Sequence, residues 1–245
     1  MQHRSKKIKK SFFIILVVLI VLSGGSAIYL GNYYHSVDVE KYMNGSSEVS
    51  VEKFDKGWFF DGAGEEKALI FYPGAKVATE AYAPLMYQLA ESGIDCFLVD
   101  MPFHMAFFGM NRAEEIMQEY NYEAWYLGGH SLGGAMAANF AADYVEDHTD
   151  GIRGLLLLAA YPTKDLSTSD MSVVTVYGSE DGVLNMDKIV AGRELMPQDY
   201  KEVCIEGGNH AQFGSYGTQK GDGTAAIPAE EQARTVEVFV GDESE

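Results

Sequence analysis

The sequence has few cysteines and few cations for its length. Its 245 residues include two cysteines, Cys96 and Cys204, which excludes a small scaffold held together by disulfides. Both lie in apolar, strand-like runs, so we expect both to be small buried hydrophobes. Lys and Arg number 18 against 36 Asp and Glu, which gives a formal net charge of −18. Such an acidic chain repels phosphate backbones, and nucleic acid is therefore excluded as a partner.

Signs of a metal site, a nucleotide site or a repeat are also lacking. Histidine and cysteine never occur at metal-ligand spacing and the acids are dispersed, so we predict no metal and no other cofactor. The glycine-rich run at residues 217–225 follows no predicted strand and opens no helix, which favours a plain loop over a phosphate site. With 47% hydrophobic and 22% charged residues, the chain is typical of one globular domain with a packed core.

One long apolar run lies near the N-terminus. Five of the 18 cations lie in the first ten residues, which hold no acid, and an unbroken apolar run at residues 12–22 follows. Residues 12–30 are long enough, at ~1.5 Å per residue, for a helix across a ~30 Å hydrocarbon layer. We expect a basic stub and a membrane anchor at residues 1–31; the small residues 25–27 leave a cleaved signal peptide as the alternative. Positive flanks stay cytoplasmic, so the rest of the chain is expected outside the cell membrane, anchored by a single pass or secreted.

After a predicted linker at residues 32–47, strand-like runs alternate with helical patterns. Several runs are apolar on consecutive residues, as strands buried on both faces of a mostly parallel sheet require. Apolar residues at i, i+3, i+4 and i+7 from Tyr82 predict a helix that Gly93 caps. Residues 48–245 are thus predicted to form one α/β domain with helices on both faces of the sheet. The eight predicted strands are residues 49–54, 57–60, 68–72, 95–100, 124–128, 154–160, 172–177 and 200–205, and further helices are predicted at residues 112–120, 132–145, 187–195 and 229–239.

The strand at residues 124–128 runs directly into a G-x-S-x-G pattern centred on Ser131. A nucleophile needs a tight strand-to-helix turn that exposes it, and the glycines at 129 and 133 let neighbouring chain pass closely. The pattern alone is weak, because a glycine-rich turn can simply join a strand to a helix. A serine also needs a histidine to remove its proton and a carboxylate to orient that histidine.

Both partners are present in loops that follow later strands. Asp181 follows the strand at residues 172–177, and His210 follows the strand at residues 200–205. The carboxyl ends of parallel strands meet at one edge of a sheet, so these side chains are expected near Ser131. Glu180 and Glu206 compete for the role of the acid, but Asp181 precedes Gly182 in a turn and is favoured.

The segments GGHSLGG, GSEDG and GGNHAQFG, in this chain order, resemble the α/β-hydrolase superfamily over nearly all of residues 48–240. The resemblance implies Ser131, Asp181 and His210 as a catalytic triad. It also implies an oxyanion hole formed by the backbone N–H groups of Leu132 and of either Ala75 or Lys76, in the segment FYPGAKV. The rest of the sequence around these motifs resembles a bacterial branch of the superfamily that is often labelled dienelactone hydrolase or carboxymethylenebutenolidase. Those enzymes carry a cysteine at the nucleophile position, and the serine found here instead implies a serine carboxylic-ester hydrolase.

We therefore expect an enzyme that cleaves small carboxylic esters, including short acyl esters or lactones, through an acyl-enzyme. The short connection at residues 161–171 predicts little or no cap over the site. An apolar stretch at residues 101–110 could line a substrate pocket, with Phe103, His104, Phe107 and Phe108 as candidates. An acyltransferase acting on a cell-surface acceptor and a non-catalytic scaffold with the same fold remain the alternatives.

Overall fold

The computed structural model describes residues 16, 18, 25, 31–64, 66–148 and 151–241, and only the backbone at residues 235 and 237–241. The chain divides into two compact units, Met1–Tyr33 and Tyr34–Glu245. The predicted membrane segment, residues 12–30, belongs to the first unit and, apart from Leu16, Val18 and Gly25, lies outside the described residues. Within the part of the chain that is described, no helix has both the length and the hydropathy to cross a bilayer.

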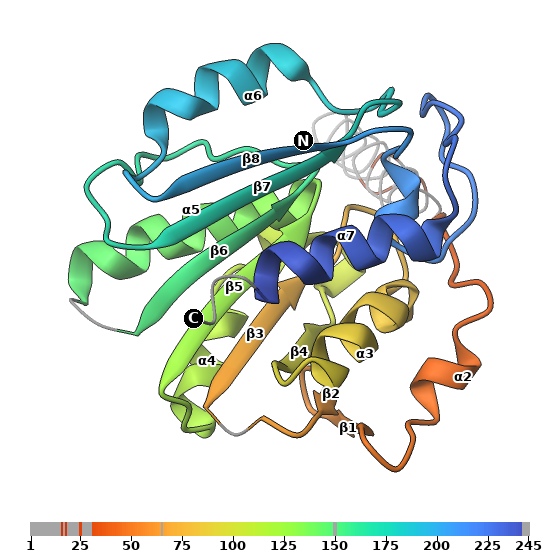
Figure 1. The fold of residues 1–245 in the computed structure, drawn as a ribbon, viewed down its shortest axis with the longest axis horizontal. Coiled ribbons are helices and arrows are strands. Elements are labelled where there is room, and N and C mark those ends of the chain that lie inside the picture. The colour runs from red at the N-terminus through yellow and green to blue at the C-terminus, as the bar shows by residue number, and fades with distance from the viewer. Residues whose placement is uncertain are drawn as a thin grey trace, which may run out of the picture. The chain divides into compact units, whose positions relative to one another are not determined.

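The second unit is built on one eight-stranded sheet (Figure 1). The strand order is β1-β2-β4-β3-β5-β6-β7-β8; β2 pairs antiparallel with β1 and β4, and all other neighbours are parallel. All eight predicted strands are present, with boundaries within two residues of those expected. The strands are β1 (Ser50–Phe54), β2 (Gly57–Asp61), β3 (Lys67–Tyr72), β4 (Asp95–Val99), β5 (Ala124–His130), β6 (Ile152–Leu158), β7 (Ser172–Gly178) and β8 (Tyr200–Ile205).

Burial along the strands follows their place in the sheet. All five residues of β4 and five of the six in β3 are buried, which explains their continuous apolar sequences. The outer strands β1 and β8 are largely exposed or half-buried. Cys96 in β4 is buried as expected, but the expectation for Cys204 was wrong. Cys204 is exposed because it lies on the outermost strand β8, whose side chains are mostly exposed or half-buried.

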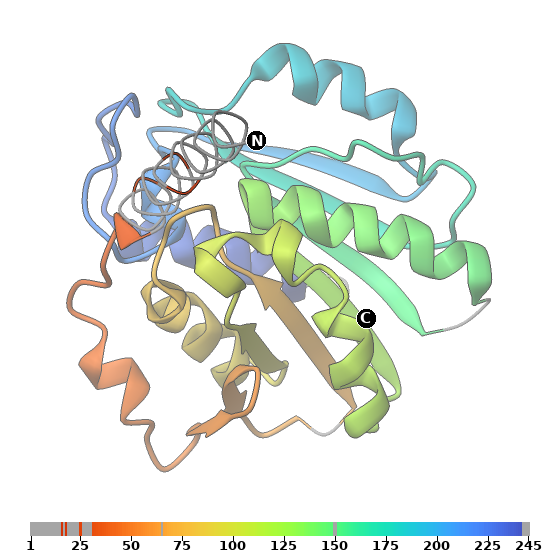
Figure 2. The same cartoon turned by 180° about the vertical axis from the view of Figure 1, so that it is seen from behind.

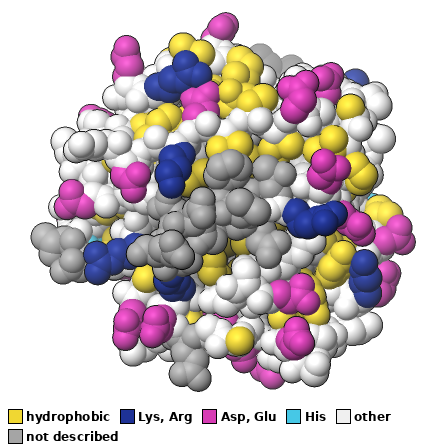
Figure 3. All heavy atoms as spheres, viewed as in Figure 1, with side chains coloured by type: hydrophobic (Ala, Val, Ile, Leu, Met, Phe, Trp, Pro, Cys, Tyr) yellow, Lys and Arg dark blue, Asp and Glu magenta, His cyan; other side chains and the backbone are white. Residues whose placement is uncertain are grey.

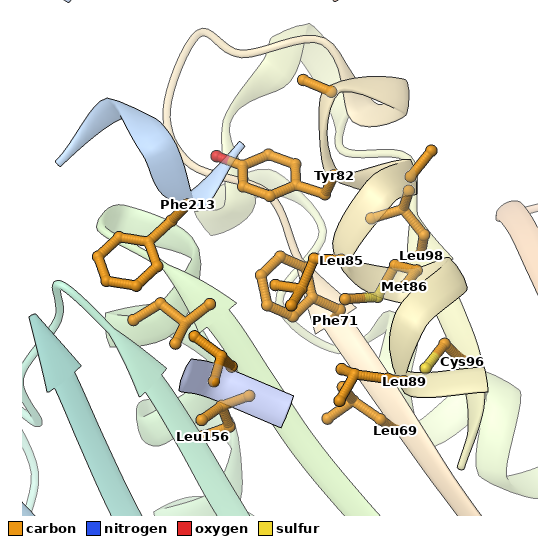
Figure 4. Close-up of a cluster of buried hydrophobic side chains, with 14 of the residues drawn as sticks. Leu69, Phe71, Tyr82, Leu85, Met86, Leu89, Cys96, Leu98, Leu156 and Phe213 are labelled. Atoms are coloured by element: carbon orange, nitrogen blue, oxygen red, sulfur yellow. The ribbon is translucent and has the colours of Figure 1, made fainter. Parts of the chain in front are cut away.

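Helices cover both faces of the sheet, as predicted. Figure 1 shows α3 (Ala83–Glu91) and α7 (Ala229–Gly241) in front of the sheet, and Figure 2 shows α4 (Arg112–Glu119) and α5 (Leu132–Asp147) on the opposite face. Each face has its own apolar cluster. In the cluster drawn in Figure 4, Leu85, Met86 and Leu89 of α3 pack on Leu69 and Phe71 of β3. Gly93 has the left-handed φ of +93° that the predicted cap requires.

Short elements complete the connections between strands. Helix α6 (Met186–Gly192) lies between β7 and β8. Residues 159–171, between β6 and β7, contain no helix, so no cap domain is inserted there. The other helical elements of the second unit, among its described residues, are α2 (Glu40–Met43) and the 3₁₀ turns η1 (Thr79–Tyr82), η2 (Pro102–His104), η3 (Ala106–Phe108), η4 (Arg193–Leu195) and η5 (Ala211–Phe213).

The second compact unit begins at Tyr34, within the predicted linker at residues 32–47. Tyr34 forms a parallel bridge with Val77, and α2 follows a few residues later. Sequence patterns give no signal for this packing, because it depends on backbone hydrogen bonds to loops far away along the chain.

Candidate active site

Ser131 lies on the tight turn that joins β5 to α5. Its backbone angles, φ 53° and ψ −122°, are those that a side-chain-bearing residue rarely adopts. The turn is held in place because the Ser131 N–H donates to the Leu158 carbonyl of the neighbouring strand, at 2.9 Å. This strained strand-to-helix geometry is the one that the G-x-S-x-G pattern predicted for an exposed nucleophile.

Two glycines make the turn sterically possible. A Cβ at Gly133 would lie 2.1 Å from the Tyr72 carbonyl oxygen and 2.4 Å from that of Pro73. A Cβ at Gly129 would lie 2.6 Å from the carbonyl carbon of Gly133. The expectation that these glycines allow close passage of neighbouring chain is confirmed, and the loop after β3 is thereby brought against the start of α5.

Asp181, after β7, and His210, after β8, meet at the carboxyl edge of the sheet. His210 Nδ1 lies 2.8 Å from Asp181 Oδ2, and each side chain is only 2% exposed. The other carboxylate oxygen, Oδ1, accepts the N–H groups of Val183 at 2.9 Å and Leu184 at 2.8 Å. A carboxylate held by two amide donors can only accept from the imidazole, so Nδ1 carries the hydrogen and Nε2 has its lone pair free.

The competing acids do not replace Asp181. Glu180 is exposed and accepts a hydrogen bond from the Ser179 hydroxyl at 3.3 Å. Glu206 is also exposed. Of the three carboxylates that the sequence offered, Asp181 is the one in contact with His210.

The structure does not join the Ser131 hydroxyl to His210 by a hydrogen bond. Among the described residues, the buried Nε2 of His210 has no hydrogen-bond partner. The ring of His130, the residue before Ser131, lies against the His210 ring with centroids 4.4 Å apart. Asp181 and His210 are therefore in contact, and His210 lies beside the turn that carries Ser131. A bond from serine to histidine often shortens only when substrate binds.

Asp222 holds the histidine loop to the acid loop, a role that sequence reasoning missed. Its Oδ1 accepts from the N–H groups of His210 and Gly182, both at 3.2 Å. Its Oδ2 accepts from the Ala211 N–H at 2.8 Å. The run at residues 217–225 is thus more than a plain loop. A single carboxylate between Gly221 and Gly223 was the signal that could have identified it.

Helix α7 holds the same histidine loop from its other side. Gln232 is fully buried and exchanges two hydrogen bonds with the backbone of Asn209: its Oε1 accepts the Asn209 N–H at 3.1 Å, and its Nε2 donates to the Asn209 carbonyl at 2.8 Å. The residue before His210 is therefore fixed to the C-terminal helix.

The loop after β3 distinguishes the two candidate oxyanion donors. The Lys76 N–H donates to the His104 carbonyl at 2.8 Å and is already engaged. Within the described chain, no hydrogen bond is made by the Ala75 N–H. Leu132 is the first residue of α5, so its N–H has no partner within the helix and lies at the positive end of the helix dipole.

The candidate pocket residues form an exposed aromatic surface beside this loop. Phe103, Phe107 and Phe108 are 58%, 46% and 53% exposed, and Phe108 contacts the other two rings at centroid distances of 5.6 and 4.1 Å. Phe103 and His104 are consecutive residues with positive φ, 56° and 55°. Such strain is often found near functional sites. Burial lowers the pKa of His104, which favours the neutral imidazole.

Neither thiol offers an alternative nucleophile. Burial raises the pKa of Cys96 well above its usual value. The thiol of Cys204 is exposed but still loses part of its hydration, and this, with the neighbouring carboxylates of Glu206 and Glu202, also raises its pKa, so both thiols stay protonated. In the described part of the chain, no three His, Cys, Asp or Glu side chains are grouped closely enough to bind a metal ion.

Comparison with known proteins gives one family. A model of the alpha/beta hydrolase family matches residues 68–234. Est1E from Butyrivibrio proteoclasticus is 16% identical, with a TM-score of 0.57 over 81% of this chain and 99% of that chain. Carboxyl esterase 2 from the mycorrhizal fungus Tuber melanosporum is 13% identical, with a TM-score of 0.60 over 86% and 89% of the two chains. A bacterial heroin esterase is 13% identical, with a TM-score of 0.56 over 83% and 87%.

Comparison with curated protein sequences gave no significant match. At these identities, the solved structures establish a common fold and do not establish a common substrate. The family model, however, covers well over half of the chain and includes the strands from β3 to β8, the serine turn and the loops that carry Asp181 and His210. This chain therefore belongs to the alpha/beta hydrolase family.

Proposed function

We propose that this chain is a serine hydrolase that cleaves small carboxylic esters through an acyl-enzyme. The observation that carries the proposal is the buried Asp181–His210 pair beside the strained turn of Ser131. An imidazole whose Nδ1–H donates a hydrogen bond to a buried carboxylate is arranged to act as a base through Nε2. The esterases among the structures of similar fold also support an ester substrate.

The proposed reaction has two matching halves. His210 Nε2 accepts the Ser131 proton while Oγ forms a bond to the ester carbonyl carbon. The tetrahedral intermediate then expels the alcohol oxygen, which takes the proton back from Nε2. In the second half, water gives its proton to Nε2, attacks the acyl carbon and releases the carboxylic acid, and Ser131 regains its proton. Asp181 stabilises the imidazolium in both halves.

The oxyanion is held by two backbone N–H groups in this proposal. Leu132 at the start of α5 supplies one, and Ala75 supplies the other, because the Lys76 N–H is engaged by His104. Loss of one such donor typically costs ~2.7–4 kcal/mol of transition-state stabilisation.

The substrate is proposed to be a short, uncharged ester or lactone whose apolar part contacts Phe103, Phe107 and Phe108. These rings lie on a loop linked to the oxyanion loop through the Lys76–His104 hydrogen bond, and η3 packs near α5. Phe108→Ala should lower kcat/KM for a butyrate ester by about 3- to 10-fold more than for an acetate ester. Val190→Ala, which truncates a similarly exposed apolar side chain on α6, is the control.

The proposed nucleophile is tested with a p-nitrophenyl ester and a fluorophosphonate probe. Ser131→Ala should abolish labelling and reduce kcat by about 10⁴-fold or more. Cys204→Ala should change neither, because its exposed thiol is not the nucleophile. Parent-level turnover by Ser131→Ala would contradict the proposal. Absence of labelling in the unmodified protein would favour the non-catalytic scaffold, and ester formation with an added alcohol would identify an acyltransferase.

The cellular location is a separate part of the proposal. The basic cluster and the apolar run at residues 12–30 support a single membrane pass with the hydrolase domain outside the cytoplasm. Intact-mass measurement of the product from membrane and medium fractions tests this. A membrane-bound chain of full mass is expected, whereas a shorter chain in the medium would indicate signal cleavage.

A further inference from the structure

A tyrosine hydroxyl and an imidazole are buried together behind the proposed nucleophile. Tyr82 and His130 have almost no exposed surface, and Tyr82 Oη lies 2.7 Å from His130 Nδ1. Tyr82 ends η1, whereas His130 ends β5 and precedes Ser131. Figure 4 shows the Tyr82 hydroxyl at the rim of the apolar cluster, on the side where Phe213 lies. Burial of polar groups at such a position is costly unless they are hydrogen-bonded to one another.

The hydrogen bonds assign the protons of this pair. Tyr82 Oη accepts the Gly74 N–H at 3.0 Å. Burial raises the pKa of Tyr82, so the phenol keeps its proton, and the acceptor within reach is His130 Nδ1. Burial, with His210 beside it, lowers the pKa of His130 well below its usual value. His130 is therefore a neutral imidazole that carries its hydrogen on Nε2.

The pair contacts two of the loops that the proposed reaction needs. A Cβ at Gly74 would lie 2.8 Å from both His130 Nδ1 and Tyr82 Oη, so the loop that carries Ala75 is seated directly on the pair. On its other side the His130 ring lies against the His210 ring, and the Phe213 ring lies 5.7 Å away. One buried hydroxyl thus connects the oxyanion loop, the end of the nucleophile strand and, through His130, the base.

We propose that Tyr82 and His130 are positioning residues: together they hold the His210 imidazole and the Ala75 backbone in the geometry that acyl transfer requires. This inference rests on the proposed serine-hydrolase function. A neutral ring at His130 also supports His210 without placing a second positive charge next to the imidazolium that forms during the reaction.

The test compares Tyr82→Phe with Tyr216→Phe. Tyr82→Phe removes the shared hydroxyl and keeps the ring, so kcat should fall about 10-fold or more with KM changed by less than about 3-fold. Tyr216→Phe removes another buried hydroxyl, 3.0 Å from Gln219 Oε1 and without a bond to His130, and should leave kcat unchanged. Rates are expressed per fluorophosphonate-titrated site, so a loss of folded protein does not count as a loss of kcat.

Rescue separates positioning from packing. His130→Asn keeps an acceptor near the position of Nδ1 and should retain more kcat than His130→Leu. Tyr82→Phe should cost less kcat in the His130→Leu background than in the parent, because only the hydroxyl's bond to the Gly74 N–H then remains to be lost. Normal kcat in Tyr82→Phe, with Ser131 still labelled in the parent, would overturn this inference and leave the proposed function intact. An active Ser131→Ala protein would overturn the proposed function itself.

Discussion

At the scale of single residues, the carboxylates of Asp181 and Asp222 hold the loops around the proposed site by accepting hydrogen bonds from backbone N–H groups. Asp181 accepts two amides as well as His210, and Asp222 accepts amides from both the acid loop and the histidine loop. Bonds from amides to a charged acceptor are stronger than neutral ones, at about 1.5–3 kcal/mol each. Asp222 accepts only backbone N–H groups, so a neutral substitute there should loosen the loops without removing a group from the proposed reaction.

Asp222→Asn tests this at one atom. The amide nitrogen cannot accept, so at least one of the bonds from His210, Gly182 or Ala211 is lost, and we expect kcat to fall about 10-fold and Tm to fall by about 3–8 °C. Steady-state kinetics and thermal unfolding measure both. Asp165→Asn is the matched control, because Asp165 accepts the Ser167 N–H in an exposed loop, and it should leave kcat unchanged. Equal effects of the two substitutions would contradict a special role for Asp222.

At the scale of an element, residues 34–37, called the strap below, tie two loops near the proposed site to the N-terminal part of the second unit. The Tyr34 N–H donates to the Lys76 carbonyl at 2.7 Å, and the Tyr34 carbonyl accepts the Ala78 N–H at 2.8 Å. The Val37 N–H donates to the Ser215 carbonyl at 2.8 Å. The strap is thus bonded to the oxyanion loop at one end and to the segment after η5 at the other, so loss of either attachment should loosen the corresponding loop.

Val37→Pro removes the strap's donor to Ser215, because proline has no N–H. Loss of one such bond should speed hydrogen–deuterium exchange in residues 211–220 by about 5-fold and lower kcat modestly. Mass-spectrometric exchange measures the first effect. Val37→Ala keeps the N–H and shortens a half-exposed side chain, so its exchange should match that of the parent. Identical exchange in both variants would show that the strap bond does not restrain this loop.

The outer strand β8 carries an ionic cluster centred on Glu202. Arg193 donates to both carboxylate oxygens of Glu202, at 2.7 and 2.6 Å, and Tyr177 and Tyr200 also donate to this carboxylate. The hydrogen bonds from Arg193 lower the pKa of Glu202 to about 2. A carboxyl with a depressed pKa stabilises the fold above its unfolded pKa of about 4.3, and this contribution is lost as the pH falls towards 2.

Glu202→Gln should therefore lower Tm at pH 7 and approach the parent's Tm as the pH falls from about 4.5 towards 2. Thermal unfolding between pH 7 and pH 3 measures the difference. Glu206→Gln, at an exposed position near the end of the same sheet edge, controls for the loss of one negative charge and should show a smaller difference at pH 7. A difference for Glu202→Gln that does not shrink on acidification would rule out the ionic origin.

The acidic surface acts at the scale of the whole molecule. Beyond the first ten residues, the chain carries 13 basic residues against 36 acidic ones. Figure 3 shows acidic side chains distributed over the face seen in Figure 1, without one dominant patch. A field of this kind repels anions at long range and leaves neutral molecules unaffected.

A neutral aryl ester should therefore react faster than a carboxylated aryl ester of the same length. We expect kcat/KM to differ by at least about 3-fold at 10 mM salt, and the ratio to shrink at 300 mM salt as the charges are screened. Initial rates at both salt concentrations measure the ratio. Two neutral esters of different length serve as the control, and their ratio should not depend on salt. A salt-independent ratio for the charged pair would contradict electrostatic selection.

The strands, the serine turn and the Asp181–His210 pair could be predicted because each depends on a local pattern. Consecutive apolar residues mark a doubly buried strand, and a parallel sheet brings the ends of such strands to one edge. Asp222, Tyr82 and the strap could not be predicted. Their partners are backbone groups or rings from loops that are adjacent only in the folded chain. The choice between Ala75 and Lys76 likewise depended on the His104 carbonyl.

By itself the sequence determined the fold class and the identity of the nucleophile, acid and base candidates, because hydrophobic periodicity and turn chemistry are encoded within short windows. Tertiary structure alone decided which N–H groups remain available near Ser131, which loops are tied together and that Cys204 faces solvent. Those features depend on backbone donors and acceptors that every residue carries, and so no residue pattern marks which of them will meet.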